Sequence, residues 1–600
     1  MCSVRADSGL DYYGSMLLHL RPLHLSLACA LLLGTPAFAQ PATTQTEQPQ
    51  PSLSEQERAA MSAELFYEIL LAEMAGGQGD LVSAQQLMLE AARSAKSEQL
   101  YRRATELGLQ SRSGERALVA AKEWKAAFPE SRDANRFVLQ ILIALNRVSD
   151  TVQPLQQEIT LTPAPSKPAT FLAIAQLYSR VSDKVLAAAV VEQAFANELK
   201  DPVSGAAAWA TVGHLRVISE QKELALEAAK QSFQMSPNNG AAALLALELM
   251  EANVPDAEPI VQGYLQNQPA ATIRMAYARV LMGYDRNDAA LEQLQILTKE
   301  NPEFPDAWLA LAGMYYEKGD WKPAQEALQH FVPLADKHPD SSQRQASLTQ
   351  AYLLNARIAI KQNDLQDASQ WLAKIEGGEG NLNVQSLRAS VLAKQDKLPQ
   401  ARALIRAVPT RNTEQDRLKR RAEIQLLRDS NAPQEAYLLQ RSLFDQAPEN
   451  NDMAYETAIL AEQAGKYDTA ESLLRAIIQR DAGYHHAYNA LGYSFAERGI
   501  RLEEARALIE KALELAPEDP FIMDSLGWVE FQQGHTEKAL EILEKAYGLR
   551  NDVDIGAHLG EVLWKRGDTR RARTLWKDGL QRDPENKTLR STLERLKVKL

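Results

Sequence analysis

A repeat of about 34 residues, present three times near the C-terminus, constrains the fold of this 600-residue chain more than any other feature. Three sets of small residues recur at intervals of 33 to 35 residues: Gly492, Gly527 and Gly560; Gly499, Gly534 and Gly567; and Ala505, Ala539 and Ala572. Such a period, with small residues at fixed offsets, is typical of an array of helix pairs. The first and third sets allow two helices to cross closely, and the second set allows the chain to reverse after a helix ends.

The repeated segments resemble the tetratricopeptide repeat (TPR) consensus, most clearly in "AYNALGYSFAERG" and "EEARALIEKALELAP". A composition of 24% charged and only 6% aromatic residues suits a helical solenoid. The resemblance implies an all-α fold, a right-handed TPR superhelix of roughly 11–14 helix-turn-helix units. Within this array, Trp308 and Trp576 are expected in the core.

The first 39 residues have the three parts of a secretory signal peptide. Arg21 precedes an apolar run from Leu25 to Gly34, and Ala37-Phe38-Ala39 forms a small-residue cleavage site before Gln40. The fifteen residues before Met16 add nothing that a signal needs, so Met16 is the expected start. The sequence therefore predicts export to the periplasm.

The two cysteines, Cys2 and Cys29, both precede the predicted cleavage site, so the exported chain would have neither disulfides nor thiols. Cys29 raises the alternative of an outer-membrane lipoprotein anchored through a modified cysteine and facing the periplasm. The preceding Ser26-Leu27-Ala28 has the small residue expected next to the cysteine, but it lacks the usual leucine three residues before it. Both a soluble and a lipid-anchored form remain open from the sequence.

The rest of the chain divides by composition and by the regularity of the repeat. Residues 40–56 read as a disordered tether rich in Pro, Gln and Thr. The further segments are an N-terminal TPR-like array (57–153), a loop and joint with four prolines (154–168), a central TPR array (169–339), degenerate TPR-like units with loops at 376–381 and 408–415 (340–448), regular C-terminal TPR units (449–586) and a basic capping helix (587–600).

No catalytic motif is present, and no cofactor or metal is expected. The sequence has neither a phosphate-binding glycine loop with its lysine nor a metalloprotease or nucleophile-elbow motif. The only histidine pair, His485-His486, points in two directions on a helix and is poorly placed to hold one metal. A net charge of −12 opposes general nucleic-acid binding, and no run after residue 40 is apolar enough to span a membrane. The sequence indicates a non-enzymatic protein that binds other proteins.

The first helix of each TPR unit lines the concave face, so its side chains predict a protein-binding groove. The C-terminal units would supply Tyr455, His486, Asn489, Tyr493, Glu497, Phe521, Asp524, Trp528, Phe531, Trp564 and Lys565. Aromatic anchors beside hydrogen-bonding groups are typical of interface centres. For Trp528 and Trp564, a place in the groove and a place in the seam between repeats both remain open. Residues 565–600 carry a net charge of +7, either a solvated cap or a docking patch for an acidic partner or an anionic membrane surface.

Beyond the repeat, "ELFYEILLAEMAGGQGD" near the N-terminus and "AHLGEVLWKRGDTRRARTLW" near the C-terminus resemble a proteobacterial family of exported TPR proteins. Its members include outer-membrane lipoproteins that bind and activate a periplasmic carboxyl-terminal processing protease and deliver cell-wall hydrolases to it. The resemblance implies a periplasmic adaptor with that protease and its substrates as partners. The alternative is a structural assembly factor for the cell envelope or for exopolysaccharide secretion machinery.

Overall fold

The computed structural model describes residues 55–267, 269–584 and 586–600, and its secondary structure over these residues is entirely helical. The predicted signal peptide, the alternative anchor Cys29 and nearly all of the predicted tether lie outside the described residues. The first described helix begins at Glu55, inside the range assigned to the tether. The described chain forms two compact units, which meet in sequence at Met314 and Tyr315.

The N-terminal unit consists of α-helices with short connections, several of which contain a 3₁₀ turn. The α-helices are α2 (Glu55–Gly77), α3 (Leu81–Ala95), α4 (Glu98–Gln110), α5 (Gly114–Ala127), α6 (Arg132–Ala144), α7 (Val152–Thr160), α8 (Lys167–Tyr178), α9 (Lys184–Ala194), α10 (Gly205–Ile218), α11 (Lys222–Met235), α12 (Gly240–Glu251), α13 (Glu258–Leu265), α14 (Ala271–Gly283) and α15 (Asn287–Glu300). The 3₁₀ helices are η3 (Val148–Thr151), η4 (Ala164–Ser166), η5 (Glu198–Lys200) and η6 (Pro255–Ala257). The division between the two units falls inside α16 (Pro305–Lys318).

The C-terminal unit continues the same alternation of helices and tight turns. Its helices are α17 (Trp321–Asp336), α18 (Ser341–Lys361), α19 (Leu365–Ala373), η7 (Gly378–Gly380), α20 (Leu382–Lys394), α21 (Leu398–Ala407), α22 (Thr413–Asp429), α23 (Pro433–Phe444), α24 (Asn451–Gln463), α25 (Tyr467–Arg480), α26 (His485–Glu497), α27 (Leu502–Leu515), α28 (Pro520–Gln532), α29 (Thr536–Leu549), α30 (Val553–Lys565), α31 (Thr569–Arg582) and α32 (Lys587–Arg595). The predicted capping helix therefore ends at Arg595, before the last residue of the chain.

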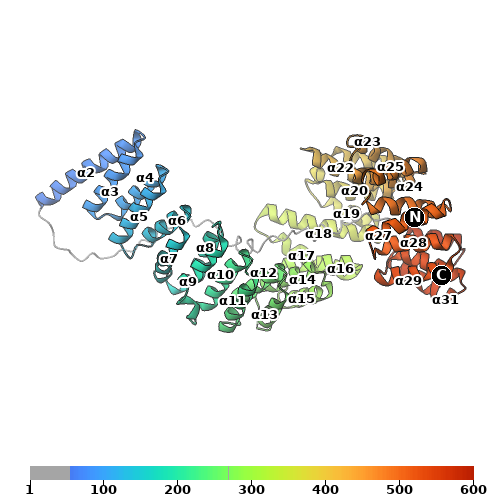
Figure 1. Cartoon of the computed structure of the whole chain (residues 1–600), viewed down its shortest axis with the longest axis horizontal. Helices are drawn as coiled ribbons and strands as arrows, with labels where there is room; N and C mark the ends of the chain where they lie inside the picture. Colours follow the sequence, from blue (N-terminus) through green and yellow to red (C-terminus); the bar gives the residue numbers. More distant parts are fainter. Residues whose placement is uncertain (1–54, 268, 585) are drawn as a thin grey trace. The chain divides into compact units, whose positions relative to one another are not determined.

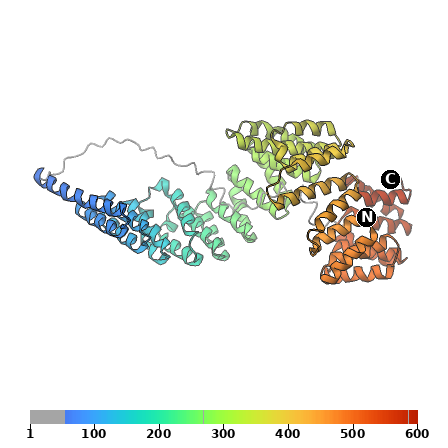
Figure 2. The ribbon, with the colours of Figure 1, turned by 90° about the horizontal axis from the view of Figure 1, so that it is seen from above.

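Helices that follow one another in sequence pack as pairs, as the repeat predicted. Seven pairs, α2 with α3 through α14 with α15, belong to the N-terminal unit, and seven more, α18 with α19 through α30 with α31, belong to the C-terminal unit. Figures 1 and 2 show such pairs side by side, for example α2 and α3. Fourteen packed pairs within the units agree with the expected number, and each unit is an all-α array of helix pairs.

The small residues of the repeat occupy the places that the spacing predicted. A Cβ atom at Gly492 would lie 2.8 Å from the backbone oxygen of Ala505, so the α26–α27 crossing leaves no room for a side chain. The turn glycine Gly534 has a φ of +86°, in the left-handed region that favours glycine. Asp519 begins the next helix by accepting hydrogen bonds from the N–H groups of Phe521 and Ile522.

The structure corrects the interpretation of residues 154–168 as a loop and joint. Pro154 lies in the first turn of α7, which continues to Thr160. A proline is tolerated there because the first N–H groups of a helix have no intrahelical acceptor. Pro168 lies equally early in α8. Pro154 and Pro168 therefore mark two helix starts, Pro163 and Pro165 lie in the short connection that contains η4, and the division between units falls near residue 314.

The core consists of small and branched apolar side chains along the helix seams. Around α26 and α27 it includes Ala487, Phe495 and Ile509, all fully buried. Trp576 is also fully buried, as the sequence predicted. Trp308 is only half-buried, and its indole N–H donates to the Pro302 carbonyl oxygen at 2.8 Å. The prediction of a core tryptophan is therefore confirmed at Trp576 only.

Candidate protein-binding sites

The predicted groove residues occupy α24, α26, α28 and α30, the first helices of four successive C-terminal pairs. Their side chains differ widely in exposure. Tyr455, Asn489, Tyr493, Asp524 and Trp528 are buried; Phe521, Phe531 and Trp564 are half-buried; His486, Glu497 and Lys565 are exposed. Partner binding by these residues stays a prediction.

The aromatic groups form separate clusters. The Trp528 ring stacks on the imidazole of His558, with centroids 4.4 Å apart and planes 24° apart, and lies 5.5 Å from Phe531. Because His558 belongs to the following repeat, this stacking is the seam contact that the sequence left as one of two alternatives for Trp528. Its indole Nε1 is buried and has no hydrogen-bond partner.

Trp564 and Tyr455 lie in other clusters. The Trp564 ring lies 5.7 Å from the Trp576 ring of the paired helix α31, so it packs within its own repeat while remaining half-buried. Tyr455 lies 5.9 Å from Tyr484 and 6.0 Å from His486, ring centroid to ring centroid. The aromatic residues of the predicted groove therefore form several separate local contacts.

A buried acid–base pair lies beside Trp528. The Nδ1 atom of His558 is 3.0 and 2.9 Å from the two carboxylate oxygens of Asp524, and both side chains are almost completely buried. Burial alone would lower the pKa of His558, but the Asp524 carboxylate more than offsets it, so the pKa is raised above its usual value. Sequence reasoning selected Asp524 but missed His558, although the two stand 34 residues apart, one repeat period.

The last helix contributes a cation to the same region. Arg595 of α32 donates two hydrogen bonds, of 2.5 and 2.7 Å, to the buried carboxylate of Glu561, and its guanidinium carbon lies 6.0 Å from the centroid of Trp528. On α26, the Tyr493 hydroxyl donates to Glu497 at 3.2 Å. The C-terminal units therefore hold charged groups next to the buried rings of Trp528 and Tyr493, and the Arg595–Glu561 pair joins α32 to α30.

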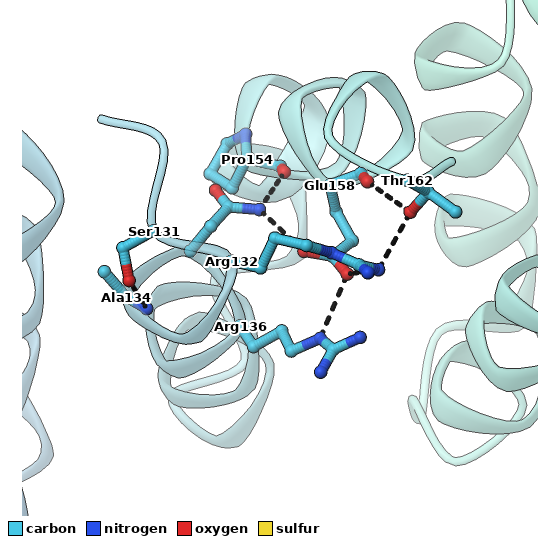
Figure 3. Close-up of polar contacts among 8 residues, drawn as sticks. Ser131, Arg132, Ala134, Arg136, Pro154, Glu158 and Thr162 are labelled. Carbon is cyan, nitrogen blue, oxygen red and sulfur yellow. Dashed lines mark hydrogen bonds and ion pairs between the residues drawn. The ribbon is translucent and has the colours of Figure 1, made fainter. Parts of the chain in front are cut away.

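A second candidate site, missed by the sequence analysis, is a cavity of about 600 Å³ in the N-terminal unit. It is lined mainly by α6, α7 and α8. Glu158 of α7 is buried and accepts hydrogen bonds from Arg132 at 2.9 Å and from Arg136 at 3.0 Å (Figure 3). The repeat is irregular here, so no fixed spacing in the sequence marked these residues as neighbours.

A third feature, also missed, is an exposed apolar stripe on α2. Phe66, Leu70 and Met74 are 66%, 43% and 52% exposed, and their spacing of four residues places them on one face of the helix. Adjacent Tyr67 is also exposed. Contiguous exposed apolar side chains mark surfaces that contact other molecules.

Within the described part of the chain, no cluster of histidine, cysteine and acidic side chains has a metal-binding arrangement. None of the helices there combines the length and the apolar character needed to cross a bilayer.

The comparisons with known proteins agree with the repeat. Tetratricopeptide repeat families match residues 275–342, 421–485, 455–520 and 556–577, so the chain contains tetratricopeptide repeats in these ranges. The TPR repeat-containing protein PA4667 of Pseudomonas aeruginosa is 31% identical over 205 residues, which cover 34% of this chain and 35% of that relative. The match thus spans about a third of the relative's length.

Two solved structures are similar to parts of the chain. The MamA RS-1 ArsTM double mutant is 19% identical, with a TM-score of 0.23, and covers 28% of this chain and 95% of its own. TTC0263, a thermophilic TPR protein of Thermus thermophilus, is 20% identical, with a TM-score of 0.27, and covers 29% of this chain and 96% of its own.

Proposed function

We propose that this chain is an exported, non-catalytic adaptor that binds and activates a periplasmic carboxyl-terminal processing protease. In this proposal it also presents substrates such as cell-wall hydrolases to the protease. Its TPR fold is typical of scaffolds that bind other proteins. The protease assignment rests on the resemblance to exported TPR adaptors, and the export assignment rests on the signal-like N-terminus.

The observation that carries the proposal is the apolar stripe of Phe66, Leu70 and Met74 on α2. A helix that presents apolar residues at such spacing fits a hydrophobic groove on a partner. The stripe can hold the protease while the C-terminal repeats hold a substrate. Tethering two partners to one chain raises their effective concentration, so the adaptor needs no catalytic group of its own.

The test is co-purification of residues 40–600 with a carboxyl-terminal processing protease from the same cells, followed by protease assays on a cell-wall hydrolase. We expect the protease to be retained and activated. The double variant Phe66→Ser, Leu70→Ser should lose at least about tenfold in affinity, because buried apolar anchors dominate such interfaces. Val119→Ser on α5, which also removes an exposed apolar side chain, is the matched control.

Failure of the unmodified chain to bind or activate the protease would refute the adaptor proposal. Retention of envelope or exopolysaccharide secretion proteins in its place would support the alternative role of a structural assembly factor. Equal loss in the Val119→Ser control would show that α2 has no special part in binding.

A further inference from the structure

The cavity between α6, α7 and α8 combines an apolar base with an arginine-rich rim. Leu139, Leu155 and Ile174 line it and are at most 5% exposed. Arg136 and Arg180 also line it, and both are exposed to solvent in part. A volume of about 600 Å³ lies within the ordinary range of ligand sites. The cavity can thus accept an apolar group at its base and a polar group at its rim.

Glu158 fixes two of the three arginines. Arg132 donates one hydrogen bond to Glu158 and another, of 2.9 Å, to the hydroxyl of Thr162 (Figure 3). Arg136 uses its Nε–H group toward the same carboxylate, and in Figure 3 its two terminal nitrogens carry no contact. A carboxylate that positions an arginine through one edge leaves the other edge oriented for a second acceptor.

The cavity carries more positive than negative charge. Arg132, Arg136 and Arg180 face a single acidic residue of the lining, Glu158, which leaves a local charge of +2 in a chain whose total is −12. Arg180 forms no ion pair with any described residue. A partly enclosed surplus of arginine attracts anions, and the planar guanidinium matches a carboxylate in two hydrogen bonds.

We propose that this cavity binds an acidic side chain of an extended protein segment, with an adjacent apolar side chain inserted at the base. The charged donors lie at the rim and the apolar residues lie below them, so a segment crossing the mouth can place both groups at once. The free edge of Arg136 and the unpaired Arg180 receive the carboxylate. This site is separate from the α2 stripe, and its peptide binding does not require the protease.

The experiment uses a library of hexapeptides capped at both ends by acetyl and amide groups, so that only side chains carry charge. The library is passed over immobilised residues 40–600, and retained peptides are identified by mass spectrometry. We expect enrichment of Asp or Glu beside an apolar residue. The best peptides are then resynthesised with a fluorophore and titrated, together with forms in which Asn or Gln replaces the acid.

Arg180→Gln should weaken the enriched peptides about tenfold, because a hydrogen bond between charged partners at a partly exposed site is lost. Arg136→Gln with Arg180→Gln should weaken them about a hundredfold and abolish the preference for the acid. Arg112→Gln, which removes an exposed arginine of the same unit outside the cavity lining, should leave affinity unchanged. Arg180 is exposed and unpaired, so its variant should fold normally by circular dichroism.

The proposal is overturned if the retained peptides show no acidic enrichment, or if the double variant binds them as tightly as the unmodified chain. Binding restricted to uncapped peptides would assign the cavity to chain ends and would likewise overturn it. Failure of the protease interaction alone leaves this result unaffected, because the library contains no protease.

Discussion

Replacing Gly492 by alanine tests the close crossing of α26 and α27 on which the repeat depends. The added Cβ atom would lie 2.6 Å from Cγ1 of Ile509 and 2.8 Å from the carbonyl oxygen of Ala505. Carbon atoms in contact normally stand about 3.5–4.0 Å apart. The Ile509 side chain is fully buried and Ala505 contributes backbone, so neither can move aside without separating the two helices.

The expected cost follows from two opposed effects. Overpacking of a well-packed core costs about 1–3 kcal/mol. Contacts as short as 2.6 and 2.8 Å place the overpacking cost in the upper part of this range, about 2–3 kcal/mol. Replacing glycine by alanine inside a helix stabilises the helix by up to about 1 kcal/mol. We therefore expect Gly492→Ala to destabilise the α26–α27 pair by about 1–2 kcal/mol, equivalent to a factor of about 5–30 in the local opening equilibrium.

Native-state hydrogen exchange measures this effect locally, which matters because a long repeat array does not unfold in one step. Amides of α26 and α27 should exchange about 5–30 times faster in Gly492→Ala. Gly548→Ala in α29 is the matched control, because no atom lies within 4 Å of the added Cβ position. This substitution should stabilise α29, so the amides of α29 should exchange more slowly than in the unmodified chain. Unchanged or slower exchange in Gly492→Ala would refute the close crossing.

Three further predictions concern charged groups. Hydrogen bonds from Arg501 lower the pKa of Glu471 to about 2, so the stabilisation from the ionised Glu471 is present above pH 4.5 and is lost as pH falls toward 2. In Glu471→Gln, the loss of stability between pH 4.5 and 2 should be smaller by about 1 kcal/mol in unfolding titrations, a value that includes solvent screening. The Asp524 carboxylate raises the pKa of His558, so the stabilisation from this pair is complete below about pH 6.5 and is lost at higher pH. His558→Gln should therefore flatten the decline of melting temperature as pH rises above about 6.5, and an unchanged slope would contradict the pairing. Glu158→Gln leaves Arg132 and Arg136 beside a neutral side chain, so it should lower the stability of the N-terminal unit by about 2–4 kcal/mol in guanidinium unfolding. A change below about 0.5 kcal/mol would show that the buried pairing contributes little.

The repeat alone predicted much of the fold because it records contacts that are local in sequence. Gly492 and Ala505 belong to one helix pair, and their crossing requires small residues whatever the neighbouring repeats do. The turn at Gly534 is equally local, because a left-handed backbone favours glycine regardless of tertiary context. Trp576 lies in the core as predicted, and its indole packs against Gly560 of the paired helix.

Other features could not be predicted from the sequence, because they depend on contacts between repeats or on irregular segments. The periodicity put Trp528 on the first helix of its pair, but the packing of the next repeat stacks its ring on His558. Pro154 suggested a loop, but the structure places it in the first turn of α7, where a proline is tolerated.

The sequence by itself determined that this protein is an array of helix pairs, because the repeat encodes crossings and turns within about 34 residues. Tertiary structure decided which side chains meet across the array. Arg132 and Arg180 are separated by almost fifty positions in a stretch without regular spacing, and the packing of α6, α7 and α8 brings both to one cavity. Contacts that combine several irregular helices have no period, so only the folded chain reveals them.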